Sequence, residues 1–450
     1  MSMSVRPARF MVYLAGAVLS GMFVVQYIGA ALIDQYIADM EFTKSDLEAI
    51  EQWDTAILDL GEYSTIACFL LIVLTVNPIF RVLRHSAAAM VAPWFIVSSL
   101  GVVALSHPDE LIRQFGQSLR LINCLFVLPA LILLAAKTER DRRQLVILSV
   151  LLFYAGYLYS SISIILRLLS DSSVIAAGFR YAFIPGHATS TASTFISAIL
   201  LLFITMAIPS YREIPKIVRR PAELVTAATA ITMIILTGSR GPFAVIVVCV
   251  GMYLFFRRRP AVILFLCLAI GTLLLLLMNS GSFSALAAYF SSREGADIST
   301  GRVDIWANVL DSVLTVKDLL SGPGTSYAAH NSIVGSLMRY GIIITLIYVV
   351  MQVFLFKQSV ISLKLSRGTE WEELCLRVLS VQSAIFVYGL FENFFYLNFG
   401  VIMFLYYLSF GVQMMFWVNF RGVRAAQVWP RKESNYGVSQ TPVPSGGGCR

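Results

Sequence analysis

The feature that most constrains this chain is a series of apolar runs, each long enough to cross a lipid bilayer. A membrane helix needs roughly 20 apolar residues, and we count about twelve such runs. Of the 450 residues, 58% are hydrophobic and only 13% are charged. The runs lie at residues 11–33, 63–80, 87–105, 118–136, 145–167, 188–208, 222–237, 242–256, 261–279, 333–356, 374–391 and 395–418. The sequence therefore predicts an all-α integral membrane protein, and no cleavable signal peptide is evident.

Basic residues occupy alternate loops between these runs, and this alternation predicts the orientation of the chain. Cytoplasmic loops are richer in lysine and arginine than outer loops. The basic loops hold Arg6, Arg9, Arg81, Arg84, Lys137, Arg140, Arg142, Arg143, Arg212, Lys216, Arg219, Arg220, Arg257, Arg258, Arg259, Lys357, Lys364, Arg367, Arg421 and Arg424. Both termini are therefore expected in the cytoplasm. The net charge of +8 reflects topology, and no nucleic-acid partner is expected.

One membrane domain, residues 1–424, precedes a tail at residues 425–450 that is expected to be disordered because it is rich in glycine, serine and proline. The longest outer loop covers residues 280–332. Within it, Ile305, Trp306 and Val309 begin an apolar pattern at helical spacing that predicts an amphipathic helix lying on the membrane. Arg302 stands at the start of this helix, where an anion could be bound.

Two further residues on the outer side carry the functional prediction. Arg240 lies between two apolar runs beside Gly241 and Pro242, and an arginine there runs against the positive-inside bias. His330 follows a Gly-Pro-Gly turn at the mouth of the run 333–356, with Asn331 or Ser332 expected as the helix N-cap. A helix N-terminus disfavours imidazolium, so a neutral His330 could accept a proton.

Arg180 and Glu392, in shorter outer loops, are weaker candidates for binding a polar substrate; each could equally be a loop residue or a salt-bridge partner. No metal or cofactor is expected. The four histidines show no metal-ligand spacing, the six cysteines form no CxxC pair, and the chain has no GxGxxG or Walker loop.

The outer-face residues suit transfer from a lipid diphosphate. Arginines would bind the diphosphate and stabilise its growing charge, and a neutral histidine would take a proton from an attacking hydroxyl.

These motifs, in this order, resemble the O-antigen ligase and O-antigen polymerase superfamily of bacterial envelope glycosyltransferases, which includes exopolysaccharide polymerases. The resemblance rests on Thr237-Gly238-Ser239-Arg240-Gly241, Gly301-Arg302-x-x-x-Trp306, Gly322-x-Gly324, His330-Asn331 and Gly341, together with Ser106-His107-Pro108 and Leu119-Arg120. It covers residues 100–415. The chain departs from the family in having Arg339 where an acidic residue is common, and Ala188-Thr189 where an asparagine is usual.

The resemblance implies a GT-C-like fold and an inverting, metal-independent transferase in the bacterial inner membrane, with its site facing the periplasm. The donor would be an undecaprenyl-diphosphate-linked glycan, bound by Arg240 and Arg302, and His330 would activate the acceptor. A polymerase would use a second lipid-linked glycan as acceptor, whereas a ligase would use lipid A–core. The outer side lacks a strongly basic patch to meet a phosphate-rich core, which favours a polymerase of O-antigen or exopolysaccharide, with a chain-length regulator as a conceivable partner.

A flippase or transporter for lipid-linked sugars is the alternative from another class. Many spans and a few polar residues would also suit that function. Against it, the sequence shows no internal repeat and no run of charged residues at mid-membrane. A flippase also has no need of a base, so the role of His330 separates the two functions.

Overall fold

The computed structural model describes the chain in several stretches. These are residues 87–127, 188–212, 214–237, 241–258, 315–323, 331–369, 371–390, 402–403, 405–411 and 413–414, with single residues at 158, 162, 262 and 311. The described residues are almost entirely helical and include no strand, which agrees with the all-α prediction. The predicted spans at 11–33, 63–80, 145–167 and 261–279 and the amphipathic helix predicted from Ile305, Trp306 and Val309 lie outside the described residues, apart from those single positions.

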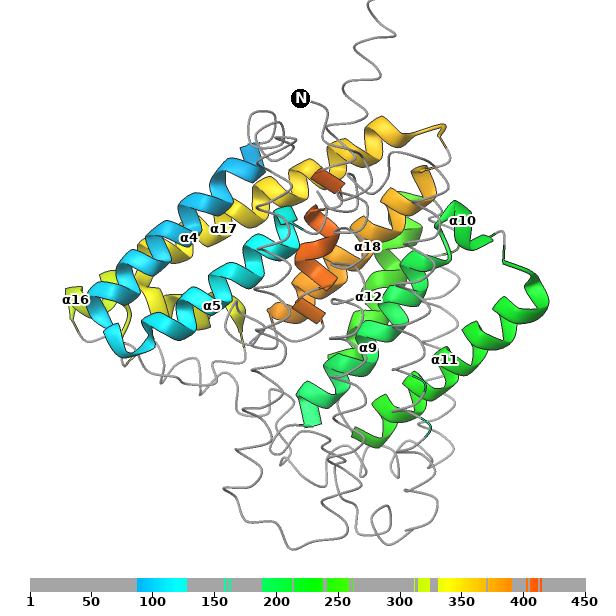
Figure 1. The fold of residues 1–450 in the computed structure, drawn as a ribbon, viewed down its shortest axis with the longest axis horizontal. Helices are drawn as coiled ribbons and strands as arrows, with labels where there is room; N and C mark the ends of the chain where they lie inside the picture. Colours follow the sequence, from blue (N-terminus) through cyan, green and yellow to red (C-terminus); the bar gives the residue numbers. More distant parts are fainter. Residues whose placement is uncertain are drawn as a thin grey trace, which may run out of the picture.

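The helices of the described part follow the apolar runs of the sequence (Figure 1). They are α4 (Ala87–Ser106), η1 (Pro108–Glu110), α5 (Leu111–Ile122), the π-helical turn η2 (Asn123–Val127), α9 (Ala188–Thr205), α10 (Pro209–Arg212), α11 (Lys216–Thr237), α12 (Gly241–Phe256), α16 (Val316–Ser321), α17 (Ser332–Ser366) and α18 (Glu372–Gly389). Most begin and end within a few residues of the predicted boundaries, because a long apolar run between polar residues is a strong local signal.

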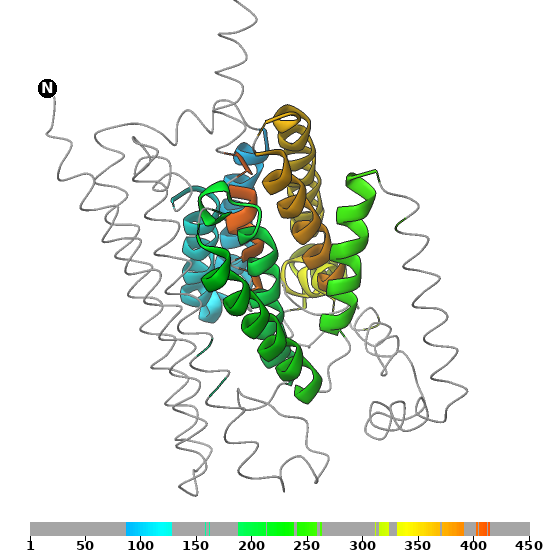
Figure 2. The same cartoon turned by 90° about the vertical axis from the view of Figure 1, so that its right-hand side faces the viewer.

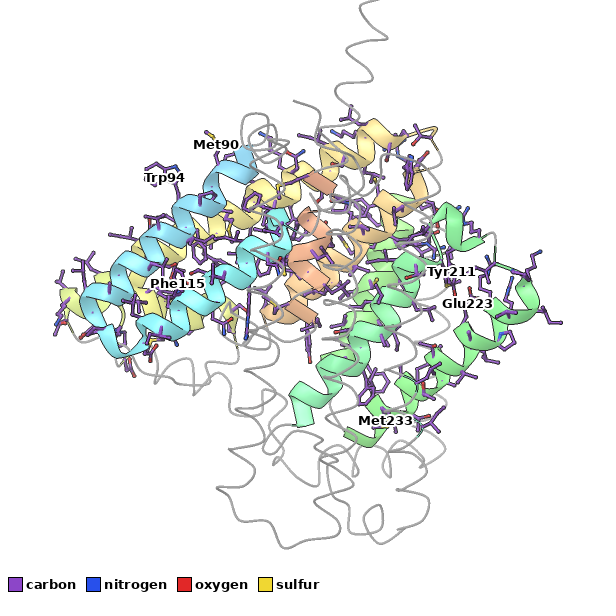
Figure 3. All side chains as sticks on the ribbon, viewed as in Figure 1. Met90, Trp94, Phe115, Tyr211, Glu223 and Met233 are labelled. Atoms are coloured by element: carbon purple, nitrogen blue, oxygen red, sulfur yellow. The ribbon has the colours of Figure 1, made fainter. Side chains whose placement is uncertain are left out.

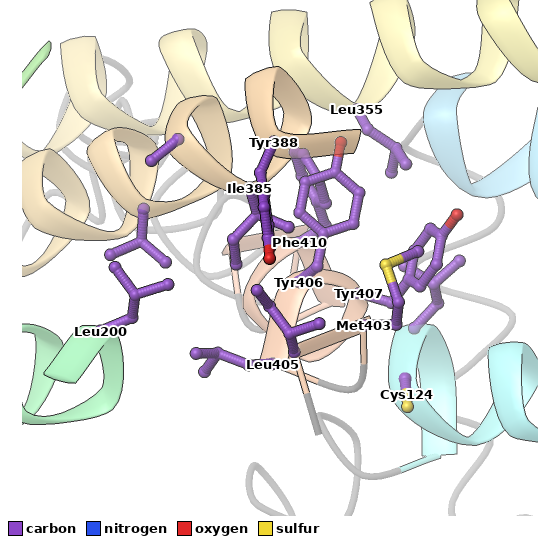
Figure 4. Packing of buried hydrophobic residues seen from close by; sticks show 14 of the residues in the cluster. Cys124, Leu200, Leu355, Ile385, Tyr388, Met403, Leu405, Tyr406, Tyr407 and Phe410 are labelled. Atoms are coloured by element: carbon purple, nitrogen blue, oxygen red, sulfur yellow. The ribbon is translucent and has the colours of Figure 1, made fainter. Parts of the chain in front are cut away.

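Two of the three main helix pairs join helices that are distant in sequence, and the third joins near neighbours. α17 lies along α4, and α12 lies along α18, while α11 packs against α9 (Figure 1). A second view shows the blue α4 and the cyan α5 side by side (Figure 2). In the core, Tyr388 and Ile385 of α18 lie near Tyr406 and Phe410 (Figure 4). Although α11 and α12 follow one another closely in sequence, α11 packs mainly on α9 and α12 packs mainly on α18.

Apolar side chains also cover the outside of the bundle. On α4, Met90 and Trp94 are 56% and 67% exposed and project outward (Figure 3). Val97 and Leu105 of the same helix are also exposed. The inward face of α4 holds Phe95 and other buried residues. In α17, by contrast, polar residues are buried, among them Ser336, Gln352, Gln358, Ser359 and Ser362. Among the described residues, α17 is the one helix long and apolar enough to cross a membrane.

α17 differs from the single span predicted at residues 333–356. It is longer, and it is broken at Gly341, where the backbone is left-handed with φ 76° and ψ −179°. Thr345 Oγ1 donates a hydrogen bond to Ser336 Oγ at 3.1 Å, although nine residues of straight helix would separate them by roughly 13 Å along the axis. The two parts of α17 therefore fold toward one another. We call Ser332–Tyr340 the half-helix.

The cause of this break is α16. Thr315 and Asp318 form a capping box at its start, and its last turn runs against the break in α17. A Cβ at Gly341 would overlap the carbonyl of Leu320, and a Cβ at Gly322, where φ is 77°, would overlap the carbonyl of Met338. Only glycine fits at these two positions, because both the backbone conformation and the close approach exclude a side chain.

Candidate functional site

The start of α12 meets the end of α18. Gly241 is the first residue of α12, and it packs so closely against the ring of Tyr388 that a Cβ at position 241 would overlap Tyr388 Cε2. Tyr388 stands in the last turn of α18 and is buried. The helix that begins immediately after Arg240 is thus fixed against the C-terminal turn of α18.

The start of the half-helix meets the same turn of α18. Asn331 is the N-cap of α17, and its Oδ1 accepts hydrogen bonds from the amides of Ile333 at 2.8 Å and Val334 at 3.1 Å. Its Nδ2 donates to the carbonyl oxygen of Leu390 at 2.9 Å. The side chain therefore uses both its acceptor and its donor, one for the helix and one for the neighbouring helix end. The prediction that Asn331 or Ser332 caps this helix is confirmed for Asn331.

A third contact completes the junction. A Cβ built on Gly389 would lie 3.1 Å from Ser332 Oγ and 3.8 Å from Ser332 Cβ, so the first turn of α17 rests on the last residue of α18. The junction, defined here as Gly241, Asn331, Ser332, Tyr388, Gly389 and Leu390, brings three helix ends together. They come from parts of the chain separated by as many as about 150 residues.

A small cavity opens beside the junction, between α17, α18 and the helical residues that follow. It is lined by Ser332, Ile333, Tyr348, Ile385, Phe386, Gly389, Leu390, Met403 and Tyr406. Most of these side chains are apolar or aromatic, and Tyr406 donates its hydroxyl hydrogen to Gln352 Oε1 at 2.7 Å. The cavity thus offers an apolar wall next to a polar helix N-terminus.

Of the predicted site residues, only Asn331 belongs to the described part of the chain. Arg240, His330, Glu392, Arg302 and Arg180 lie outside it. The first three nevertheless flank the junction in sequence: Arg240 immediately precedes Gly241, His330 immediately precedes Asn331, and Glu392 follows Leu390 by two residues. The described residues that are nearest in sequence to Arg302 and Arg180 are not part of the junction.

An ion pair that the sequence did not predict lies at the other end of the half-helix. Arg339, only 9% exposed, binds the carboxylate of Glu110 at the turn between α4 and α5. The guanidinium lies over the ring of Tyr340 at 5.8 Å, and the Tyr340 hydroxyl donates to Gln114 Oε1 at 2.6 Å. Sequence reasoning treated Arg339 as a departure from a family pattern, and no local signal links it to Glu110.

A second charged cluster joins α9, α12 and α18 at the end of the bundle remote from the junction. Glu373, one residue before the predicted span 374–391, accepts hydrogen bonds from the Tyr253 hydroxyl at 2.7 Å and Arg377 Nε at 2.9 Å, and pairs with Arg257 at 3.5 Å. Arg377 also donates to the carbonyl oxygen of Phe203 at 2.8 Å. Burial raises the pKa of Glu373, but these hydrogen bonds and positive charges outweigh burial, so the pKa of Glu373 is lowered.

Comparison with protein-family models finds no match to this chain, and comparison with curated proteins finds none either. Within the part of the chain that the structure describes, no three His, Cys, Asp or Glu side chains are grouped so that they could hold a metal ion.

Proposed function

We propose that this chain is a membrane glycosyltransferase. It moves a glycan from undecaprenyl diphosphate to an acceptor hydroxyl at the periplasmic face of the bacterial inner membrane. The observation that carries the proposal is the junction of three helix ends. Consecutive Cα atoms are about 3.8 Å apart, so the packing of Gly241 and Asn331 on one turn of α18 restricts how far apart Arg240 and His330 can be.

The proposed chemistry needs these two residues together. The acceptor hydroxyl oxygen attacks the anomeric carbon, while His330 takes the hydroxyl proton. The bond from the anomeric carbon to the diphosphate oxygen breaks on the opposite side, which inverts the anomeric centre. Undecaprenyl diphosphate leaves with the bonding electron pair, and Arg240 and Arg302 stabilise its negative charge. Arg180, Asn331 and Glu392 would bind the polar parts of the substrates.

The helices support a membrane location for this chemistry. Apolar side chains face outward on α4 and polar side chains face inward on α17, as expected where lipid replaces water around a bundle. We propose about twelve spans with both termini in the cytoplasm.

A polymerase is favoured over a ligase by the lack of a strongly basic patch among the predicted outer loops. The experiment uses purified protein in proteoliposomes with an undecaprenyl-diphosphate-linked oligosaccharide as both donor and acceptor. Wild type should give a ladder of longer glycans on a gel. Arg240→Ala and His330→Ala should each abolish the ladder, with loss of His330 lowering the rate by about 10²–10⁴-fold.

Arg220→Ala serves as the matched control, because Arg220 is an exposed arginine of α11 and should leave the ladder unchanged. Product that forms only after lipid A–core is added would make the protein a ligase. Movement of lipid-linked glycan across the bilayer without any transfer would replace the proposal with a flippase. A full ladder from His330→Ala would remove His330 from the reaction.

A further inference from the structure

The half-helix Ser332–Tyr340 is too short to define its own position. Isolated helices shorter than roughly 12 residues are marginal even with favourable sequences, so its position depends on contacts at its two ends. At its start, Asn331 and Ser332 contact the last turn of α18. At its other end, Arg339 and Tyr340 contact the α4–α5 region.

The contacts at the far end form a connected polar network. Arg339 binds Glu110, which precedes α5, and Tyr340 donates to Gln114 in the first turn of α5. Gln114 Nε2 in turn donates to Ser99 Oγ of α4 at 3.4 Å. Tyr340, Gln114 and Ser99 are all fully buried. The far end of the half-helix is thus attached to both α4 and α5.

An ion pair in this location is a poor way to gain stability. Arg339 is buried and the Glu110 side chain is 28% exposed. The free-energy cost of taking these charges out of water offsets much of their attraction, and an apolar pair of similar size often gives a protein the same stability. Among the residues that the structure describes, moreover, Arg339 Nε has no hydrogen-bond partner. The ion pair instead holds Arg339 in one position relative to Glu110, because any other position would leave a buried charge without its partner, which is strongly disfavoured.

We infer that the Glu110–Arg339 ion pair is a positioning device that sets where the half-helix presents Asn331, and with it His330, to the junction. This inference rests on the proposed transfer reaction. The nine residues of the half-helix span roughly 13 Å, so a tilt of about 10° at its Arg339 end moves its start by about 2 Å. A displacement of that size separates a base from its substrate hydroxyl. Glu110 and Arg339 touch no substrate; they act through the helix.

The kinetic test compares Glu110→Gln, Arg339→Gln and the exchanged pair Glu110→Arg/Arg339→Glu. Each single variant should lower kcat by about 10–100-fold with little change in KM, and the exchanged pair should recover part of that loss. Glu373→Gln is the matched control, because it breaks an ion pair at the remote end of the bundle. It should lower the melting temperature without lowering kcat. If Arg339→Gln behaves like Glu373→Gln, the pair is merely structural and the inference is wrong.

A cross-link measures the same position without relying on activity. The Cβ positions of Ser332 and Gly389 lie 3.8 Å apart, which is the mean separation in a disulfide. Ser332→Cys/Gly389→Cys should therefore oxidise readily, whereas each single cysteine variant should not cross-link. Adding Arg339→Gln should slow the oxidation several-fold, and adding Glu373→Gln should not. An unchanged rate with Arg339→Gln would overturn the inference even if wild type is an active transferase. A slowed rate in a protein that transfers no glycan would uphold the positioning and refute only the proposed function.

Discussion

At the scale of single residues, Asn331 links secondary structure to the candidate site. Its amide oxygen satisfies two backbone amides that the first turn of α17 would otherwise leave unpaired, and its amide nitrogen binds the end of α18. The two functions use opposite ends of one amide group. They can therefore be separated by substitutions that keep one end and remove the other.

Asn331→Ala removes both functions and should lower the free energy of unfolding by about 1–3 kcal/mol, the sum of a lost cap and a lost hydrogen bond. Asn331→Asp keeps the acceptor for Ile333 and Val334 but places a carboxylate against the Leu390 carbonyl. We expect Asn331→Asp to retain the helix start yet lose glycan transfer. Thermal unfolding in detergent and the proteoliposome assay would check this. If Asn331→Asp transfers glycan at the wild-type rate, the bond to Leu390 does not matter for the reaction.

At the scale of elements, the break in α17 separates a long apolar helix from the short half-helix. The apolar part after Gly341 packs along α4, with Phe95 and Tyr348 in ring contact at 5.7 Å. The half-helix turns back from the break toward α18. This geometry lets one element serve both as a membrane-length helix and as the support for a helix N-terminus at the junction.

Gly341→Ala should destabilise the protein strongly. The backbone at position 341 lies in a region that is nearly restricted to glycine, which alone costs about 1–3 kcal/mol, and the new Cβ would overlap Leu320. The control is Gly101→Ala in α4, where a Cβ meets nothing within 4 Å; it should be neutral or slightly stabilising. Melting temperatures of the two purified variants would distinguish them. Equal melting temperatures would mean that α17 is not broken at Gly341.

At the scale of the whole molecule, the described helices have two chemically different ends. One end holds the junction, whose residues Gly241, Asn331 and Leu390 lie next to Arg240, His330 and Glu392 in the sequence. The other holds the cluster of Tyr253, Arg257, Glu373 and Arg377. The basic loops predicted to be cytoplasmic adjoin this second end, since Arg257 follows α12 and Arg367 follows α17.

The remote cluster predicts how stability depends on pH. The pKa of Glu373 is lowered in the folded protein, so its stabilisation is fully present above the ordinary glutamate pKa and is lost as pH falls through the lowered value. Glu373→Gln should lower the free energy of unfolding at neutral pH by about 1.5–3 kcal/mol. The stability of this variant should also fall less than that of wild type as the pH becomes acidic. Melting temperature measured from neutral to acid pH checks this.

Glu372→Gln provides the comparison for that experiment, because within the described part of the chain Glu372 accepts a single hydrogen bond, from the Gly368 amide at 2.7 Å. Glu372→Gln should change the loss of stability at acid pH less than Glu373→Gln does. An identical effect of the two substitutions would show that the network around Glu373 does not govern the pH dependence.

The sequence by itself determined the helical class and the positions of most described helices, and it narrowed the N-cap of α17 to Asn331 or Ser332. These features follow from hydropathy and capping, which act between residues close together in the chain. α4, for example, occupies residues 87–106 where residues 87–105 were predicted. The roles of Arg240, Arg302, His330, Arg180 and Glu392 stay predictions, since these residues lie outside the described part.

Only the tertiary structure decided the break at Gly341, the junction and the Glu110–Arg339 pair. Gly341 was only one residue of the family resemblance, with no local sign of a break, and it becomes indispensable because α16 passes against it. Glu110 and Arg339 are 229 residues apart in the chain, and no periodicity connects them. The physical reason is that hydropathy sets whether each segment becomes a helix, whereas the partner of each helix end depends on how all the helices pack together.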